Sequence, residues 1–309
     1  MKPLPALALV GLGGVASAGQ ALANAELGAR LGAPVLGAVV NNVTALTILA
    51  LAAAVSPAMR AGLGTLRGAG LPWWTYLGGF GGALFVVGAT YAVPVLGVAV
   101  FTIAQVAGAS AGGLVVDRVG LGPTGRLALT VPRVAGALLG IGAVAIAQLG
   151  RPVGDLAMGV VLLAVAGGLG VAIQTALNGR LSRATSTVAG LTANMLVSSP
   201  IVLVVALAAG AFTGMNPWPG DFWLYLGGVL ALFVIVTMLI GVQTAGVLRT
   251  GLAIVAGQLV GAIVLDLLTP GGPPVGVALL GGAALTFVAV ALSGRGRPRP
   301  PARWQTGPS

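Results

Sequence analysis

Residues 106–117 read VAGASAGGLVVD, and residues 255–266 read VAGQLVGAIVLD. Each segment consists almost entirely of apolar and small residues and ends on an aspartate, Asp117 or Asp266. Each also lies inside a longer apolar stretch, of the length of about 20 residues that a helix needs to cross a bilayer. A membrane helix that recurs 149 residues later indicates a chain made of two related halves.

Three further pairs of motifs extend this repeat over both halves. The two members of each pair share residue types and spacing. The pairs are Gln20-x-x-x-Asn24-x-x-Leu27 with Gln174-x-x-x-Asn178-x-x-Leu181, Asn41 with Asn194, and Trp74-x-Tyr76-Leu77-Gly78-Gly79 with Trp223-x-Tyr225-Leu226-Gly227-Gly228. Because the first motif recurs in mid-chain, we expect the apolar N-terminus to be a membrane helix rather than a cleaved signal peptide.

Hydropathy predicts an all-α integral membrane protein with ten transmembrane helices. Breakers and charged residues separate the predicted spans, which are 5–24, 34–56, 73–93, 95–116, 132–149, 156–177, 187–209, 221–242, 250–268 and 274–293, with a tight hairpin at Pro94. We divide the chain into a five-helix repeat at 1–150, a second at 151–293 and a disordered, basic tail at 294–309. Because five is odd, the second repeat enters the membrane from the opposite side, and the halves are inverted repeats as in many transporters.

The positions of Lys and Arg predict which loops face the cytoplasm. With the N-terminus inside, every basic residue except Arg30 and Arg151 falls in a cytoplasmic segment, as the positive-inside rule requires. The formal charge of +10 is then a topology signal, so we expect no nucleic-acid partner. We predict a multi-pass protein of the bacterial inner membrane with both termini in the cytoplasm.

Composition excludes most catalytic chemistry. Only 6% of the residues are charged, too few to cover a water-exposed surface, and 57% are hydrophobic. The chain has no Cys and no His, which removes thiolate nucleophiles, the commonest general base and the commonest metal ligands. The few acidic residues have no catalytic or metal-binding spacing, and no P-loop is present. We therefore expect no enzyme, no cofactor and no metal.

The motifs resemble those of the YdcZ-like family of proposed inner-membrane exporters, in the drug/metabolite transporter (DMT) superfamily. The resemblance rests on Q-x-x-x-N-x-x-L in the first helix, P-W-W-x-Y-L-G-G at 72–79 and V-A-G-Q with a later Asp at 255–266, and it covers the chain up to Gly294. It implies five plus five helices, cytoplasmic termini and an export function.

Two positions depart from the family pattern. In the first half, Ala109 stands at the position where the family pattern has a glutamine, and a glutamine occurs one helical turn earlier, at Gln105. Glu26 lies too near the end of its helix to match the deep carboxylate of the small multidrug members of the superfamily. This position argues against proton coupling through a buried central acid.

Amide side chains inside the spans are the candidate substrate-binding groups, because polar residues in hydrocarbon are costly and often functional. We expect Asn41, Asn42, Gln105, Asn194 and Gln258 to line a substrate cavity between the halves, with the two glutamines nearest mid-depth. An amide both donates and accepts hydrogen bonds, which suits a neutral or zwitterionic polar ligand. The alternative is that these amides only tie neighbouring helices together.

The pairs Gln20/Asn24 and Gln174/Asn178 are each four residues apart and share a helix face near a helix end. We assign them to helix packing, with gating of one mouth of the pathway as the alternative. We also place the rings of Tyr91 and Phe101 in the predicted cavity, where they would stack on a planar or cationic ligand.

Three acidic residues lie near helix ends: Glu26, Asp117 and Asp266. For the two aspartates we expect interfacial anchoring or a salt bridge, with Arg118 or Arg126 as the partner of Asp117. Ion coupling is the alternative role for all three acids.

These features predict a secondary transporter that exports a small organic metabolite or drug by alternating access between two inverted repeats. The expected partners are the small-molecule substrate and the lipid bilayer, and the chain acts as a monomer or a homodimer. The alternative is a non-transporting scaffold or subunit of a membrane complex. A cavity lined by both halves would favour the transporter, and a dry, packed centre would favour the scaffold.

Overall fold

The computed structural model describes residues 3–122, 126, 129–147, 149, 155–245, 247–269 and 275–295. Nearly all of these residues are helical, and no strand occurs among them. The α-helices are α1 (Pro3–Arg30), α2 (Val35–Val55), α3 (Pro57–Gly64), α4 (Gly79–Val119), α5 (Val131–Ala147), α6 (Asp155–Ala184), α7 (Thr187–Ala208), α8 (Gly227–Ala245), α9 (Val247–Leu268) and α10 (Val277–Arg295). Three 3-10 helices accompany them: η1 (Thr65–Gly68), η2 (Trp73–Gly78) and η3 (Phe222–Leu226). Arg151 and most of the predicted tail lie outside the described residues.

Five helical stretches in the described part of the chain are long and apolar enough to cross a membrane. They are Leu4–Arg30, Val35–Val55, Trp73–Val119, Met158–Ala184 and Thr187–Ala208. The third has 47 residues, about twice the length of one span. Four shorter apolar helices follow, at Val131–Ala147, Phe222–Met238, Ala253–Leu268 and Val277–Leu292. The helices thus occur where hydropathy predicts them, with the predicted third and fourth spans joined into α4.

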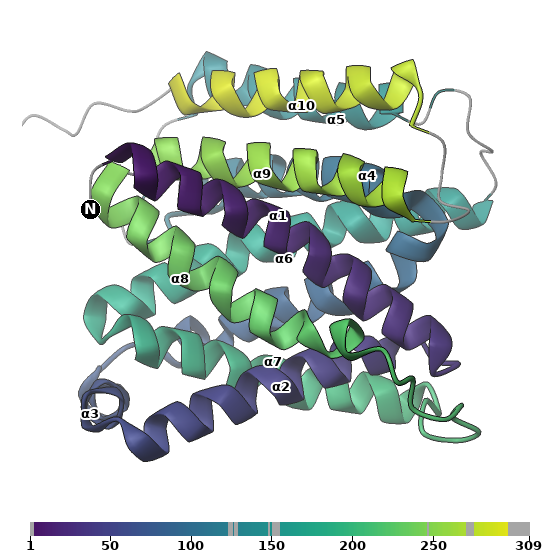
Figure 1. Cartoon of the computed structure of the whole chain (residues 1–309). Helices are drawn as coiled ribbons and strands as arrows, with labels where there is room; N and C mark the ends of the chain where they lie inside the picture. Colours follow the sequence, from purple (N-terminus) through teal and green to yellow (C-terminus); the bar gives the residue numbers. More distant parts are fainter. Residues whose placement is uncertain are drawn as a thin grey trace, which may run out of the picture.

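The helices form three layers (Figure 1). α5 and α10 pack together on one side, α2 and α7 pack together on the other, and α1, α4, α6, α8 and α9 lie between them. In the middle layer α1 packs against α8 and α9, and α6 packs along α4. In the predicted repeat α6 corresponds to α1, and the first and second parts of α4 correspond to α8 and α9. The contacts of α6 with α4 therefore repeat the contacts of α1 with α8 and α9.

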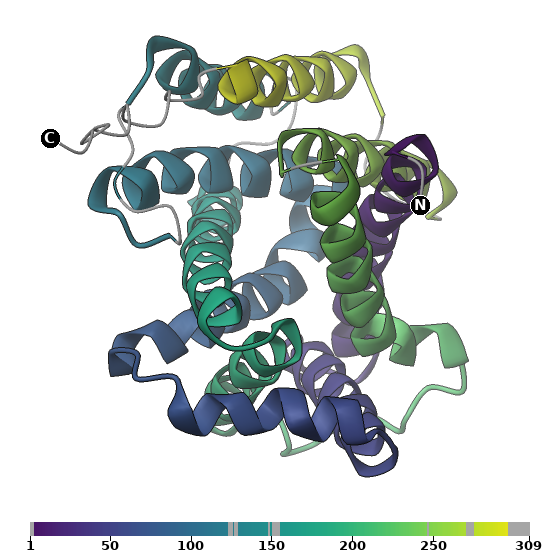
Figure 2. The same ribbon diagram turned by 90° about the vertical axis from the view of Figure 1, so that its left-hand side faces the viewer.

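A break at Gly97 divides α4 into two segments, and it corrects the predicted hairpin at Pro94. Pro94 lies inside the helix, where its ring removes a backbone donor and disfavours the helical path. Gly97, three residues later, has φ 78° and ψ 164°, a conformation that glycine adopts freely and other residues rarely. The chain turns at Gly97 without a loop, and the two segments run in different directions (Figure 2).

Glycines at matching positions allow the close contacts of the middle layer. A Cβ atom on Gly14 in α1 would lie 2.3 Å from the carbonyl oxygen of Ile254 in α9. A Cβ atom on Gly168 in α6 would lie 1.9 Å from the carbonyl oxygen of Gln105 in α4. Gly168 follows Gly14 by the same 154 residues that separate Gln20 from Gln174. Both helix pairs therefore meet backbone to backbone at equivalent sites.

The two ends of the bundle are referred to below by the short helices that mark them. The α3 end contains α3, the beginning of α1 and the end of α10 (Figure 1). The η3 end contains the end of α1, residues 209–221 and η3 (Figure 1). The predicted loop after α2 forms α3 because Ser56 accepts a hydrogen bond from Met59 N at 3.3 Å and Pro57 begins the helix.

Candidate functional site

A chain of buried polar side chains joins α1, α2 and α7. The Oδ1 atom of Asn41 accepts hydrogen bonds from Gln20 Nε2 at 3.1 Å and from Asn24 Nδ2 at 3.2 Å. Asn41 Nδ2 donates to Asn42 Oδ1 at 3.1 Å, and Asn42 Nδ2 donates to the Ser198 hydroxyl at 3.0 Å. All five side chains are buried. The last bond joins α2 of the first predicted repeat to α7 of the second.

The second half contains a smaller version of this network. Asn178 Nδ2 donates to Asn194 Oδ1 at 3.0 Å, as Asn24 does to Asn41. Gln174 occupies the position of Gln20, but its Oε1 atom is buried and has no hydrogen-bond partner within the part of the chain that the structure describes. The network is therefore satisfied on the α1–α2 side and incomplete on the α6–α7 side.

The two mid-depth glutamines also differ in hydrogen bonding, because one is paired and the other is not paired with any described residue. Gln258 Nε2 in α9 donates to Ser17 Oγ in α1 at 3.0 Å. Gln105 in α4 is 6% exposed, and its amide makes no hydrogen bond with any residue that the structure describes. A buried polar group without a partner costs about 1–3 kcal/mol. Amide atoms without a partner among the described residues thus occur at Gln105 in α4 and at Gln174 in α6, although Asn178 in α6 is paired.

The aromatic candidates lie among apolar side chains. Phe101 is buried in the largest core cluster, and its ring centroid lies 5.9 Å from that of Phe85. Tyr91 is partly buried and packs against a second cluster that includes Leu27 and Leu31. These contacts describe packing, and the stacking role of both rings stays a prediction.

Asp266 caps a helix inside the apolar layers, a role that the sequence analysis missed. Its Oδ1 accepts a hydrogen bond from Val98 N at 2.8 Å, and its Oδ2 accepts one from Ala99 N at 3.0 Å. These N–H groups begin the second segment of α4, where the break at Gly97 deprives them of helical acceptors. Pro94 and Gly97 are visible in the sequence as breakers, but the side chain that satisfies the freed groups comes from a distant helix.

Asp117 pairs with Arg133 at the beginning of α5, and this corrects the predicted partners, Arg118 and Arg126. Both members of the pair are partly buried. The end of α4 is therefore tied to the next helix along the chain instead of to its own last turn or to the following loop.

Polar contacts link the predicted halves at the η3 end. Arg30, the last residue of α1, forms ion pairs with Glu26 at 2.8 Å and with Asp221 just before η3. Asn216 Nδ2 donates to the Arg30 carbonyl oxygen at 2.9 Å, and Asn216 N donates to the Leu31 carbonyl oxygen at 3.2 Å. Glu26 thus has a structural partner, and its predicted alternative role in ion coupling stays untested.

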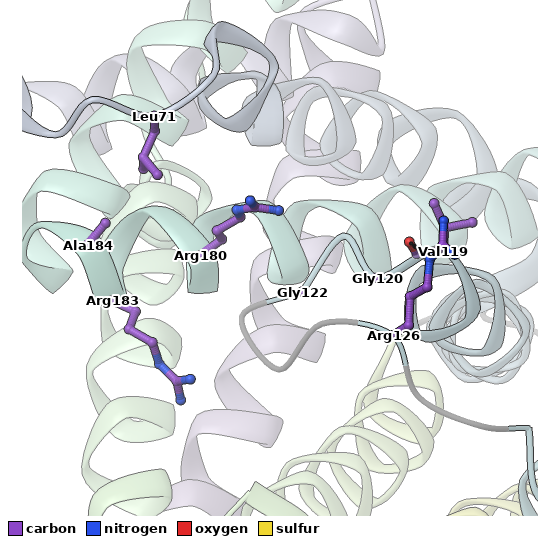
Figure 3. A pocket seen from close by; sticks show the side chains of 8 residues that line it. All are labelled: Leu71, Val119, Gly120, Gly122, Arg126, Arg180, Arg183 and Ala184. Atoms are coloured by element: carbon purple, nitrogen blue, oxygen red, sulfur yellow. Dashed lines mark hydrogen bonds between the residues drawn. The ribbon is translucent and has the colours of Figure 1, made fainter. Parts of the chain in front are cut away.

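The α3 end is hollowed by a pocket of about 500 Å³, called here the Arg180 pocket (Figure 3). Residues of both predicted halves line it: Leu71, Val119, Gly120, Gly122, Arg126, Arg180, Arg183 and Ala184. Contacts between Ser186 and Gly62 place the end of α6 beside α3, because the Ser186 hydroxyl donates to the Gly62 carbonyl oxygen at 3.0 Å. The Arg180 pocket thus lies at the α3 end, whereas ion pairs and hydrogen bonds link the predicted halves at the η3 end.

A comparison with protein-family models shows which family the chain belongs to. The model of the family described as "Putative inner membrane exporter, YdcZ" matches residues 5–146 and 159–292, which is most of the chain. The chain belongs to this family. The resemblance drawn from the motifs is thereby confirmed, and a YdcZ-family, DMT-type protein belongs to the class of inner-membrane exporters. No curated protein matches the chain.

A second, almost wholly apolar pocket of about 390 Å³ lies between η2, α4, α6 and α7 of this YdcZ-family protein. Gly81, Gly170 and Ile173 line it, and Gln174 follows directly after Ile173. None of the amides predicted to bind substrate lines either pocket: Gln258 is partly buried, and the other four are buried between the helices. Their role in substrate binding stays a prediction.

Proposed function

We propose that this YdcZ-family protein is a secondary transporter that exports a small organic molecule by alternating access between two inverted repeats. One observation carries the proposal. The helix sets α1/α8/α9 and α6/α4 make equivalent contacts, yet Gln20 on α1 is hydrogen-bonded, whereas the Oε1 atom of its counterpart Gln174 on α6 is buried without a partner among the described residues. Two equivalent interfaces in unequal states are what alternating access between repeats requires.

The contrast between the two ends supports a proposed state. If the N-terminus is in the cytoplasm, the α3 end faces the cytoplasm and the η3 end faces the other side. The Arg180 pocket then lies on the inner side, while the ion pair of Arg30 with Asp221 links the predicted halves on the outer side. We assign this arrangement to the loading state of an exporter. A scaffold needs no opening lined by both halves, so the pocket favours the transporter.

The unpaired amides suggest where the substrate binds. Gln174 on α6 has a buried Oε1 atom without a partner among the described residues, and the Gln105 amide on α4 makes no hydrogen bond with them. A neutral or zwitterionic ligand with both donors and acceptors would satisfy them and recover the cost of desolvation. In the outward state the repeats exchange conformations. The bonds of Gln20 with Asn41 and of Gln258 with Ser17 would then open instead.

Ligand-induced thermal stabilisation of the purified protein, measured against a library of metabolites and drugs, tests this proposal. Gln105→Met and Gln174→Met should each weaken the binding of the stabilising compound about tenfold, because each removes one buried hydrogen bond worth about 1–2 kcal/mol. Thr286→Val is the matched control, since Thr286 is buried in α10 and bonds only to its own helix, at Gly282.

Two outcomes would contradict the proposal. One is a library in which no compound stabilises the protein. The other is a stabilising compound whose affinity is unchanged in both glutamine variants, or falls equally in Thr286→Val. A compound that binds through Gln105 and Gln174 should also be transported into proteoliposomes, at a rate that both substitutions reduce.

A further inference from the structure

Among the described residues that line the Arg180 pocket are three arginines and no acidic residue. Figure 3 shows Arg180 and Arg126 on opposite sides of residues 120–122, with Arg183 pointing in another direction. The positive-inside rule explains why arginines gather at this end, but it does not require them to line a hollow. Their place around a pocket therefore needs an explanation other than membrane topology.

Arg180 lies over an aromatic ring. Its guanidinium carbon lies 5.0 Å from the centroid of the Trp74 ring, within the range of a cation–π contact. Stacking of this kind covers one face of the planar group and leaves the N–H donors at its edge available. The Arg180 side chain forms no hydrogen bond or ion pair with the residues that the structure describes. Arg180 is therefore an oriented donor without an acceptor.

The equivalent site at the other end of the molecule has the opposite charge arrangement. Arg180 follows Glu26 by 154 residues, the spacing that relates Gln20 to Gln174. Glu26 pairs with Arg30, and Arg30 pairs with Asp221, so each of these charged groups at the η3 end has an ionic partner within the protein. At the α3 end the position of Arg30 is taken by Ala184, which lines the pocket. The Arg180 guanidinium, in contrast, has no ionic partner among the residues that the structure describes.

We infer that the Arg180 pocket binds an oxyanion, a phosphate or carboxylate group, through the edge of the Arg180 guanidinium. The planar fork of Arg matches two oxygens of such a group and makes shorter, stronger hydrogen bonds than neutral donors do. The oxyanion has two sources: the headgroup of an anionic lipid in the adjacent leaflet, or a soluble organic anion. The inference concerns binding alone, so it can fail while transport holds, and it can hold while transport fails.

Binding measurements on the purified full-length protein separate the two sources. In the lipid arm, native mass spectrometry measures retention from an equal mixture of phosphatidylglycerol and phosphatidylcholine. In the soluble arm, calorimetry measures the binding of inorganic phosphate in a neutral detergent, with chloride at the same ionic strength as the reference. Arg180→Gln should weaken binding about tenfold in the arm that reports the true source, because a hydrogen bond to a charged group is lost.

Arg118→Gln is the matched control, since it removes the same charge from an exposed position at the same end, outside the pocket. Arg180→Lys keeps the charge but loses the planar fork, and it should weaken binding less than Arg180→Gln does. This second variant keeps the test decisive if Arg180→Gln does not fold. Selective phosphatidylglycerol retention that depends on Arg180 assigns a lipid headgroup, and Arg180-dependent phosphate binding assigns a soluble anion. Binding that is absent in both arms, or equally weakened by Arg118→Gln, overturns the inference.

Discussion

Asp266 shows how one side chain makes a break in a membrane helix tolerable. In an apolar layer no water is available, so each backbone N–H that a break sets free must find an acceptor within the protein. Gly97 frees the N–H groups of Val98 and Ala99, and the two oxygens of Asp266 accept one each. A carboxylate is also favourable at this position because a helix N-terminus carries partial positive charge.

Replacing Asp266 should destabilise the protein in proportion to the oxygens removed. Asp266→Ala leaves two buried donors unsatisfied and should lower the free energy of unfolding by about 2 kcal/mol. Asp266→Asn keeps one acceptor and should cost about half as much. Unfolding in mixed micelles, followed by circular dichroism, measures both. Asp117→Asn breaks a partly exposed ion pair and should cost less than about 1 kcal/mol. Equal losses at Asp117 and Asp266 would contradict the capping role.

At the scale of the helices, the two halves are held together by close approach more than by large side chains. Gly14 in α1 and Gly168 in α6 bring their helices into contact with the backbones of α9 and α4. Without a hydrophobic driving force between helices in lipid, such contacts and interhelical hydrogen bonds stabilise the association. The bond between Asn42 and Ser198 adds a polar link where α2 meets α7.

Adding one methyl group at these contacts should separate the helices. Gly14→Ala and Gly168→Ala place Cβ within 2.3 Å and 1.9 Å of a backbone carbonyl oxygen, so each should lower the free energy of unfolding by about 1–3 kcal/mol. Gly113→Ala in α4 is the control, because nothing lies within 4 Å of its Cβ position. It should be neutral or stabilise the helix by up to about 1 kcal/mol. Thermal unfolding in one detergent ranks the three variants, and a ranking with Gly113→Ala as the worst would reject this account.

At the scale of the molecule, the sequence predicts the positions of the helices well and their partners poorly. Hydrophobic length is a local property, so the spans and the repeat can be found without knowing the fold. The partner of a polar side chain depends on how distant helices align. For this reason the Asp266 cap was missed, the partner of Asp117 was predicted wrongly, and the pairing of Asn42 with Ser198 was not foreseen. The break in α4 is partly predictable from the sequence. Pro94 and Gly97 indicate that a break occurs nearby, but only the packing determines that it occurs at Gly97.

The orientation of the whole bundle can be tested directly because the natural chain has no cysteine. Thr65 in η1 lies at the α3 end and Thr213 lies in the segment before η3, and both are exposed. Arg60 and Arg67 flank Thr65, so the positive-inside rule places that end in the cytoplasm. A membrane-impermeant maleimide should therefore label Thr213→Cys in intact cells, and Thr65→Cys only after permeabilisation. The reverse pattern would turn the Arg180 pocket outward and make the described state one that releases its substrate instead of loading it.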